Sequence, residues 1–377
     1  MTTKITCVVG GTGGHIYPAI SLAEKLKERN NNISIDFIGD KRPIVKKIIE
    51  GESYNAYNVT AAPFPRKKIW NIISFILKTE LGFIESLIYL IKNKPDVLVS
   101  FGAYISVPVV FAAKLLRIPI VIHEQNYYPG LANKFLKFAA EKIAVSYEES
   151  IPYFSEKKVV LTGNPVRSRL FQISRDQGLK YFKLEAGRVN ILIFGGSQGA
   201  QSINLSILGV LPYIEDMNDK INFIHICGTK NLDEVEASYS EFGFNAIVRE
   251  YIEHMEYAYS LADLIVARAG ATTIAEISAL GIPSILIPYP GASENHQNFN
   301  TTYICEAGAA ICYDEEGLGG EGLALRLAPL ISDAEKRREM SMNSNQFREV
   351  FTNASTRLAE VVEEVTEGKK RSRCLKE

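Results

Sequence analysis

Short apolar runs alternate along the chain with segments in which apolar residues recur every three or four positions. This alternation is typical of a parallel sheet with helices on both faces, and it places the chain in the α/β class. The first series of apolar runs predicts strands at Thr6–Val9, Ile33–Ile38, Val97–Val99, Ile120–Ile122, Ile143–Val145 and Val159–Leu161. The second series predicts strands at Ile191–Phe194, Phe223–Ile226, Ile247–Val248, Leu264–Ala267 and Ser284–Ile287.

Both series begin alike, with a strand, a glycine-rich turn and a helix. The turns are GGTGG at 10–14 and GGSQG at 195–199. We interpret this as two similar doubly wound, Rossmann-like domains over 1–163 and 164–344, joined at a Gly-Asn-Pro hinge. The length of 377 residues suits two domains.

The chain after the second domain is expected to return to the first. A helical stretch at about 345–367 is predicted to pack back on domain 1–163, and residues 368–377 read as a frayed basic tail.

Charge is divided unevenly between the two halves. Residues 1–163 hold 21 Lys and Arg against 14 Asp and Glu, a net of +7, whereas residues 164–377 hold 21 against 29, a net of -8. The first half is therefore expected to meet an anionic partner, with nucleic acid and an acidic membrane surface as the candidates. No apolar run approaches the ~18 residues of a membrane span, and MTTKITCVV leads directly into a strand with no signal peptide, so any membrane contact is predicted to be peripheral.

The five cysteines indicate a reducing cytoplasm. Their number is odd and they show no CxxC spacing, which argues against a zinc site. Cys7 and Cys227 lie in apolar runs, where cysteine is usually a small core residue.

The glycine turns are candidate anion sites. Glycine allows close approach of the backbone to a ligand, and the helix expected to open near Pro18 presents free N–H groups. The second turn adds the side chains of Ser197 and Gln198. Purely structural turns are the alternative. A dinucleotide-binding dehydrogenase fits poorly, because Ile16 stands where its fingerprint needs Gly or Ala and Asp40 is placed in a loop.

Polar residues follow the glycine turn and a later strand. His15 ends the first turn, where it is either a general base or only a cap of the turn. His123, Glu124, Gln125 and Asn126 come at the carboxyl end of a strand, where open α/β sheets bind ligands; alternatively His123 and Glu124 satisfy each other structurally.

A third turn, RAGATT at 268–273, opens another helix. Thr272 and Thr273 either cap this helix or bind phosphate, and Glu276 either accepts ribose hydroxyls or is a solvated helix residue. The polar loop at 288–298 either reads sugar hydroxyls or is an ordinary surface loop.

Seven motifs occur together in the order found in the MurG family. They are GGTGGH-x-x-P (10–18), FGAY (101–104), HEQN (123–126), GNPVR (163–167), GGSQGA (195–200), RAGATTIAE (268–276) and ENHQ (294–297). The resemblance spans about residues 4–345. It implies a GT-B architecture with an interdomain cleft as the active site, and a UDP-N-acetylglucosamine transferase of peptidoglycan synthesis. The substrates would be UDP-GlcNAc and undecaprenyl-linked lipid I.

The resemblance also implies roles for individual residues. On the donor side these are uracil binding near Ile252, ribose binding by Glu276, diphosphate binding at Ala271, Thr272, Thr273, Arg167, Ser197 and Gln198, and GlcNAc binding by His296 and Gln297. On the acceptor side they are diphosphate binding at Thr12, Gly13, Gly14, Gly102 and Tyr104, with His15 and Asn126 beside the acceptor hydroxyl.

The family implies inversion at the anomeric carbon. His15 is our first choice of general base, with Glu124 second. We expect no cofactor and no essential metal, because no DxD motif precedes a suitable strand end and helix N-termini with Arg167 can neutralise the diphosphate.

The segment from Arg66 to Lys78 has basic residues beside Ile69, Trp70, Ile73 and Phe75. It fits a helix lying on the anionic cytoplasmic face of the cell membrane, and a helix buried against the sheet is the alternative. Nucleic acid is not expected as a partner, because no recognition helix or aromatic-basic strand face is present.

Three other functions are compatible with parts of the pattern. A diacylglycerol glycosyltransferase would share the glycine turns, although HEQN and GNPVR favour the peptidoglycan enzyme. A UDP-sugar epimerase would need more acids near the nucleotide than Glu124, Glu276 and Glu294. A non-catalytic nucleotide-binding module is the third.

Overall fold

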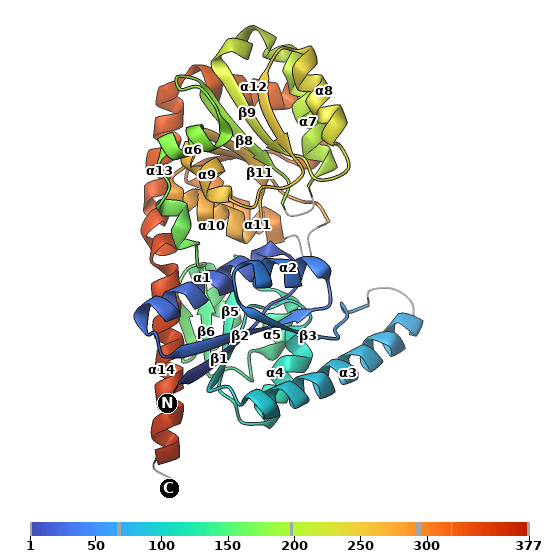
Figure 1. Cartoon of the computed structure of the whole chain (residues 1–377), viewed down its shortest axis with the longest axis vertical. Helices are drawn as coiled ribbons and strands as arrows, with labels where there is room; N and C mark the ends of the chain where they lie inside the picture. The colour runs from blue at the N-terminus through green and yellow to red at the C-terminus, as the bar shows by residue number, and fades with distance from the viewer. Residues whose placement is uncertain (1, 66–68, 197–198, 292–295, 318, 375–377) are drawn as a thin grey trace. The chain divides into compact units, whose positions relative to one another are not determined.

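The computed structural model describes residues 2–65, 69–196, 199–291, 296–317 and 319–374. The chain forms two compact units, the first made of Met1–Val166 with Val350–Glu377 and the second of Arg167–Glu349. Each unit is built on one parallel sheet flanked by helices (Figure 1). The prediction of two doubly wound α/β domains is confirmed.

The first unit has a seven-stranded sheet in the order β3-β2-β1-β4-β5-β6-β7. Its strands are β1 (Thr3–Val8), β2 (Ile33–Asp40), β3 (Asn55–Val59), β4 (Val97–Ser100), β5 (Ile120–Glu124), β6 (Lys142–Val145) and β7 (Val159–Leu161). Its helices are α1 (Gly13–Arg29), α2 (Pro43–Gly51), α3 (Ile69–Asn93), α4 (Ser106–Leu115), α5 (Leu131–Leu136) and α14 (Ala354–Cys374).

Both faces of this sheet are buried. Successive side chains of a strand point to opposite faces, so β1 contributes to two cores. Cys7 packs in a cluster with residues of α1, α2 and α14, whereas Val8 belongs to a cluster with residues of α3, α4 and α5. Burial on both sides explains why the central strands are almost continuously apolar.

The second unit has a six-stranded parallel sheet in the order β10-β9-β8-β11-β12-β13. Its strands are β8 (Val189–Phe194), β9 (Ile221–Ile226), β10 (Asn245–Arg249), β11 (Leu264–Arg268), β12 (Ser284–Ile287) and β13 (Ala310–Cys312). Its helices are α6 (Arg175–Phe182), α7 (Gln201–Val210), α8 (Leu232–Glu241), α9 (Met255–Leu261), α10 (Ala271–Leu280), α11 (His296–Glu306), α12 (Gly320–Ser332) and most of α13 (Ala334–Thr352).

Two strands were not predicted from the sequence. β3 and β13 each lie at one edge of their sheet, opposite β7 and β10. β3 reads NAYNV and only Val59 in it is fully buried, while β13 has three residues. An edge strand buries less surface than a central one, so neither segment carries a strong apolar pattern.

Two helix boundaries differ from the predictions. α1 begins at Gly13 rather than near Pro18, so Gly13 and Gly14 form its first turn and Pro18 lies inside the helix. α14 continues to Cys374, and Lys369 Nζ donates to the carbonyl oxygens of Pro95 and Asp96 at 3.2 and 3.1 Å. The prediction of a frayed tail from residue 368 was therefore wrong over most of its length.

A disulfide joins Cys305, near the end of α11, to Cys312 in β13, with a Cα–Cα distance of 6.1 Å. The cysteine pattern had indicated reduced thiols, so this pair is a correction. Cys7 and Cys227 are buried and free, as expected for core cysteines. Within the described ranges, no helix is both long and apolar enough to cross a bilayer.

Candidate active site

The strand order of the first unit reverses between β1 and β4, and parallel sheets bind ligands at such a point. The loops after these strands carry the first glycine turn and the FGAY turn, and they touch. A Cβ on Gly10 would lie 2.6 Å from Ile105 Cγ2 and 3.3 Å from Ala103 Cβ. Glycine is therefore required at this position for the two turns to meet.

His15 lies in the first turn of α1 and against the glycine turn. Its Nδ1 is 2.7 Å from the Phe101 carbonyl oxygen, and Gln125 Nε2 is 2.7 Å from the same oxygen. Gln125 Nε2 is also 2.6 Å from His15 Nδ1, so the tautomer of the ring decides which of these atoms donates. In the tautomer with the proton on Nδ1, His15 donates to the Phe101 carbonyl oxygen and the lone pair is on Nε2, as a general base requires. Sequence reasoning offered no basis for expecting Gln125 beside His15, since the two residues are 110 positions apart.

Glu124 is buried at the end of β5, with 1% of its surface exposed. Its Oε1 accepts from Asn126 N at 2.9 Å and Asn126 Nδ2 at 3.0 Å, and its Oε2 accepts from Gly130 N at 3.0 Å and Asn133 Nδ2 at 2.8 Å. Burial raises the pKa of Glu124, and these hydrogen bonds oppose the rise. This geometry favours a carboxylate that positions Asn126 over one that accepts a substrate proton.

His123 does not pair with Glu124, so the structural alternative considered for HEQN was wrong in that detail. His123 Nε2 donates to the Gly163 carbonyl oxygen at 3.2 Å. Burial lowers the pKa of His123 to about 4, so it is neutral near pH 7.

The remaining acceptor-side residues lie on the same two turns. Thr12 is the N-cap of α1, is exposed and makes no side-chain cap hydrogen bond. Gly102 adopts φ +84, a conformation that favours glycine. Burial, and after it the charge of Asp40, raises the pKa of Tyr104.

The second unit reverses its strand order between β8 and β11. Gly199 has φ +74, and a Cβ there would lie 2.5 Å from the Cys227 carbonyl oxygen. Ser197 and Gln198 lie outside the described residues. After β11, α10 begins at Ala271 behind the N-cap Gly270, so the N–H groups of Ala271, Thr272 and Thr273 are those of a helix N-terminus.

Glu276, on α10, is held by two other side chains. Arg167 donates to Glu276 Oε1 from Nε at 2.9 Å and from Nη2 at 2.8 Å, and Tyr259 Oη donates to Oε2 at 2.9 Å. Arg167 is 3% exposed and Glu276 4% exposed. The alternative that Glu276 is a solvated helix residue was therefore wrong. Arg167 is bound to the Glu276 carboxylate and is not exposed to solvent.

Arg268, the first residue of RAGATT and the last of β11, connects three segments that are distant in the chain. It donates to Ser202 Oγ at 2.7 Å, to both Glu315 oxygens at 2.9 Å and to the Pro288 carbonyl oxygen at 3.1 Å. Burial alone would raise the pKa of Glu315, but the hydrogen bonds from Arg268 hold it below its ordinary value. Sequence reasoning gave Arg268 no role, because its partners are distant in the chain.

The other donor-side candidates lie on loops of the same edge. Ile252 follows β10 and is buried. His296 and Gln297 begin α11, and Gln297 Oε1 accepts from Tyr289 N at 2.9 Å. This bond uses one of the two acceptor positions of the Gln297 amide oxygen.

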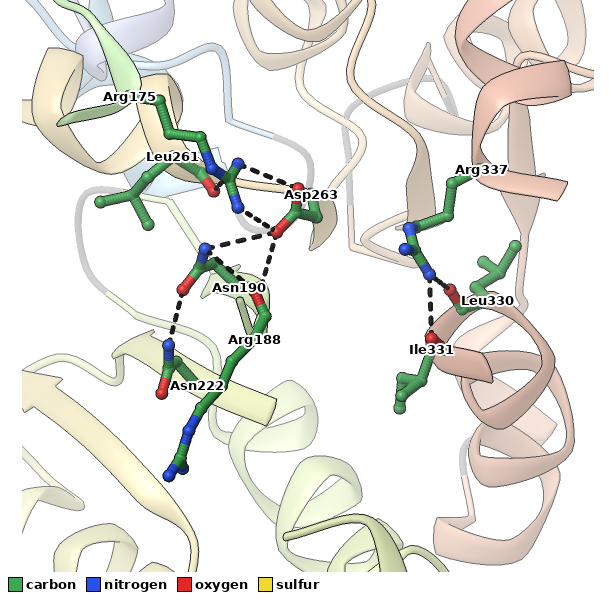
Figure 2. A network of polar contacts seen from close by, with 9 residues as sticks. All are labelled: Arg175, Arg188, Asn190, Asn222, Leu261, Asp263, Leu330, Ile331 and Arg337. Carbon is green, nitrogen blue, oxygen red and sulfur yellow. Dashed lines mark hydrogen bonds and ion pairs between the residues drawn. The ribbon is translucent and has the colours of Figure 1, made fainter. Parts of the chain in front are cut away.

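A separate polar network lies at the amino-terminal ends of the strands of this sheet, opposite the carboxyl ends that carry the glycine turn (Figure 2). Arg175 donates to Asp263 at 2.8 and 2.9 Å, and Asp263 accepts from Asn190 N at 2.8 Å. Asn222 Nδ2 donates to Asn190 Oδ1 at 2.9 Å. Asn190, Asn222 and Asp263 stand at the amino ends of β8, β9 and β11, away from the strand ends that carry the glycine turns, and Arg175 begins α6. We assign them to the architecture of the sheet.

Known proteins share both halves of this arrangement. Residues 5–145 match the glycosyltransferase family 28 N-terminal domain and residues 190–361 its C-terminal domain. The UDP-N-acetylglucosamine–N-acetylmuramyl-(pentapeptide) pyrophosphoryl-undecaprenol N-acetylglucosamine transferase of Halothermothrix orenii is 40% identical over 374 residues, 97% of this chain and 100% of the relative. A crystal structure of Acinetobacter baumannii MurG has a TM-score of 0.73 at 25% identity, covering 96% of this chain and 99% of that one. The chain belongs to the MurG family. It is therefore a glycosyltransferase, and the resemblance seen in its motifs is confirmed.

The fold alone is less specific than this membership. A crystal structure of UDP-GlcNAc 2-epimerase from Neisseria meningitidis bound to UDP-GlcNAc has a TM-score of 0.68 at 16% identity, covering 96% of this chain and all of that one. At this identity the likeness shows a common fold only. The full-length identity to MurG relatives decides between the two.

Proposed function

We propose that this chain transfers N-acetylglucosamine from UDP-GlcNAc to the 4-hydroxyl of the muramyl residue of lipid I, giving lipid II. The proposal is carried by the 40% identity, over 97% of this chain, to the Halothermothrix orenii relative whose name describes this transfer. The placement of the two groups of candidate residues at the switch points of two nucleotide-binding-type sheets supports it.

For the donor, the second unit supplies a base site near Ile252, a ribose site at Glu276 and a diphosphate site at the N-terminus of α10. A carboxylate offers about four acceptor positions, and three at Glu276 are used by Arg167 and Tyr259. One ribose hydroxyl therefore fits at Glu276 Oε2 without rearrangement, rather than two. Arg167 acts here as the residue that positions Glu276. His296 and Gln297 remain the groups proposed for GlcNAc, and Ser197 and Gln198 stay proposed on the resemblance alone.

For the acceptor, the first unit supplies the turns at Thr12–Gly14 and Gly102–Tyr104, with His15 and Asn126 beside them. The muramyl 4-oxygen attacks C1 of GlcNAc from the face opposite UDP. The C1–O bond breaks with its electron pair on the diphosphate, and the hydroxyl proton passes to His15 Nε2, so the configuration inverts. The helix N-terminal amides of α10 stabilise the diphosphate charge, and no essential metal is proposed.

The anionic cytoplasmic membrane surface is the proposed site of action, through α3. Six exposed apolar residues follow one another at helical spacing: Ile73, Leu77, Leu81, Ile84, Ile88 and Ile91. This α3 stripe is longer than the segment suggested by the sequence. Phe75, which that segment included, packs on Phe64 with the ring centroids 5.5 Å apart. Arg66, Lys67 and Lys68 lie outside the described residues, and the side chains of Ile69 and Trp70 are not described. An apolar helix face beside basic residues suits an acceptor that is lipid-linked.

One assay tests the function against its rivals. The protein is incubated with labelled UDP-GlcNAc, a lipid I analogue and diacylglycerol, and the products are separated. A disaccharide-lipid with free UDP is expected. Labelled UDP-ManNAc would indicate an epimerase, transfer only to diacylglycerol a glycolipid enzyme, and bound but unchanged UDP-GlcNAc a binding module.

A further inference from the structure

An ion pair lies beside the first glycine turn and has no part in the functions assigned so far. Asp40, the last residue of β2, accepts from Arg42 Nε at 2.9 Å through Oδ1 and from Arg42 Nη2 at 2.5 Å through Oδ2. Asp40 Oδ2 also accepts the N–H of Gly11 at 3.0 Å. Sequence reasoning had considered Asp40 only as a poor ribose ligand in a loop.

This pair changes what the glycine turn can offer an anion. The Gly11 N–H is already bound to Asp40, so it is not available to a phosphate. Burial alone would raise the pKa of Asp40, but the hydrogen bonds from Arg42 and Gly11 lower it, and the group is a carboxylate near pH 7. At Gly11, the guanidinium of Arg42 is therefore the group that can attract and bind an anion in place of the Gly11 N–H.

Arg42 is placed against the residues of the acceptor turns. Its Nη2 lies 3.6 Å from the position of a Cβ on Gly11, and His15 Cδ2 lies 3.3 Å from the same position. The Arg42 guanidinium carbon is 5.9 Å from the centre of the Tyr104 ring. Asp40 occupies Nε and Nη2, and in the described part of the chain Nη1 has no hydrogen-bond partner. The guanidinium thus keeps donors for a ligand.

The side chain of Arg42 is open to solvent although its carboxylate partner is buried. The side chains of Arg167 and Arg268, which also pair with carboxylates, are 4% and 10% exposed. The Arg42 side chain is 38% exposed, while that of its partner Asp40 is 5% exposed. The guanidinium of Arg42 is therefore accessible to a ligand beside the glycine turn.

We propose that Arg42, fixed in place by Asp40, binds the diphosphate of the lipid-linked acceptor. The inference rests on the proposed function and adds a residue to its acceptor site. Guanidinium suits this task, because its planar fork donates to two phosphate oxygens at once and stays charged.

The test compares two water-soluble acceptors: a lipid I analogue with a short prenyl diphosphate, and the same saccharide with an uncharged alkyl linker in place of the diphosphate. The variants are Arg42→Ala, Arg42→Lys and the double variant Asp40→Asn with Arg42→Gln. The double variant removes both charges, so an unpaired buried carboxylate cannot cause its phenotype. Arg29→Ala is the matched control, because Arg29 pairs with Glu363 at the other end of α1.

Loss of a charge-assisted phosphate contact should lower kcat/KM for the diphosphate acceptor by roughly 10-fold to 100-fold in Arg42→Ala and in the double variant. The change should lie mainly in the acceptor KM, with Arg42→Lys intermediate. The KM for UDP-GlcNAc, transfer to the uncharged acceptor and the Arg29→Ala control should stay near the wild-type values.

Equal losses on both acceptors would overturn the inference in favour of a structural role, and so would no loss on either. Anionic vesicles provide a further arm: if Arg42→Ala reduced vesicle binding but left the KM of the soluble diphosphate acceptor unchanged, its ligand would be a phospholipid headgroup and the inference would fall. If the wild type used neither acceptor, the proposed function itself would fail.

Discussion

The pair Arg167–Glu276 allows a quantitative test of the donor site. Both side chains are nearly inaccessible, at 3% and 4% exposure. Removing one partner from a buried ion pair leaves the other charge uncompensated, at a cost of about 3–5 kcal/mol. We expect this loss of stability in the second unit for Glu276→Gln and for Arg167→Met. The double variant removes both charges and should lose no more than either single variant.

Hydrogen–deuterium exchange is the suitable assay, because a two-unit chain is not expected to unfold in one step. Peptides from β11 and α10 should lose protection in the single variants, and peptides from β1 and α1 should not. Arg175→Met is the control: its pair with Asp263 has side-chain exposures of 44% and 25%. Its loss should cost about 1 kcal/mol or less.

The double-mutant cycle also tests the count of acceptor positions at Glu276. Arg167→Met should raise the KM for UDP-GlcNAc although Arg167 is not proposed to touch the ribose, since it releases the carboxylate from its orientation. If Glu276→Gln destabilised the unit no more than Arg175→Met does, the buried pair would not exist as described. Glu276 would then have all its oxygen positions available for ribose.

The remaining predictions concern the base, the membrane face, metal dependence and pH. His15→Ala should lower kcat by about 10²–10⁴ and leave UDP-GlcNAc affinity nearly unchanged, as measured by steady-state kinetics and calorimetry; an active variant would exclude the assigned role. Replacing Leu77 and Leu81, which are 60% and 48% exposed, by Ser should weaken flotation with anionic vesicles by about 2 kcal/mol, or roughly 30-fold. Leu325→Ser, at a 70% exposed site of the second unit, is the control. If the variant with Ser at 77 and 81 floated as well as this control, the α3 stripe would not be the membrane-binding surface. Turnover should be unchanged in excess EDTA, and loss with recovery on adding Mg²⁺ would contradict a metal-free site. Burial lowers the pKa of His225 to about 3 from an ordinary 6.5, so its stabilising contribution is complete above pH 6.5 and is lost as the pH falls toward 3. Between pH 6.5 and 5 the second unit should lose about 2 kcal/mol, and His225→Gln should flatten this dependence in denaturant titrations.

The sequence predicted the central strands and the edge strands β7 and β10, and it missed the edge strands β3 and β13. Central strands such as β1 and β11 are apolar because both faces are buried, and this pattern is visible in the residues themselves. β3 and β13 lack it because β3 contains two Asn residues and buries only Val59 fully, and β13 is only three residues long. The α1 boundary was misplaced because Pro18 resembles a helix start, whereas the capping geometry begins the helix at Gly13.

The candidate residues were identifiable from motifs, but their pairings were not. Gln125 on the Phe101 carbonyl and Arg268 on Glu315 join residues that are 24 and 47 positions apart. A sequence shows that such side chains are present, and only the fold shows which of them meet. The role of Glu124 changed for this reason, from a second candidate base to a carboxylate already occupied by its neighbours.

The return of α14 to the first unit has a consequence for biosynthesis. Leu358, Ala359 and Val362 complete a core whose other members, such as Cys7 and Ile20, lie near the start of the chain. A ribosome therefore synthesises most of the residues of this core first, and it synthesises α14, which completes the core, only after the whole second unit. The nascent first unit must carry an uncovered apolar surface throughout that interval, when it is most open to chaperones and to aggregation.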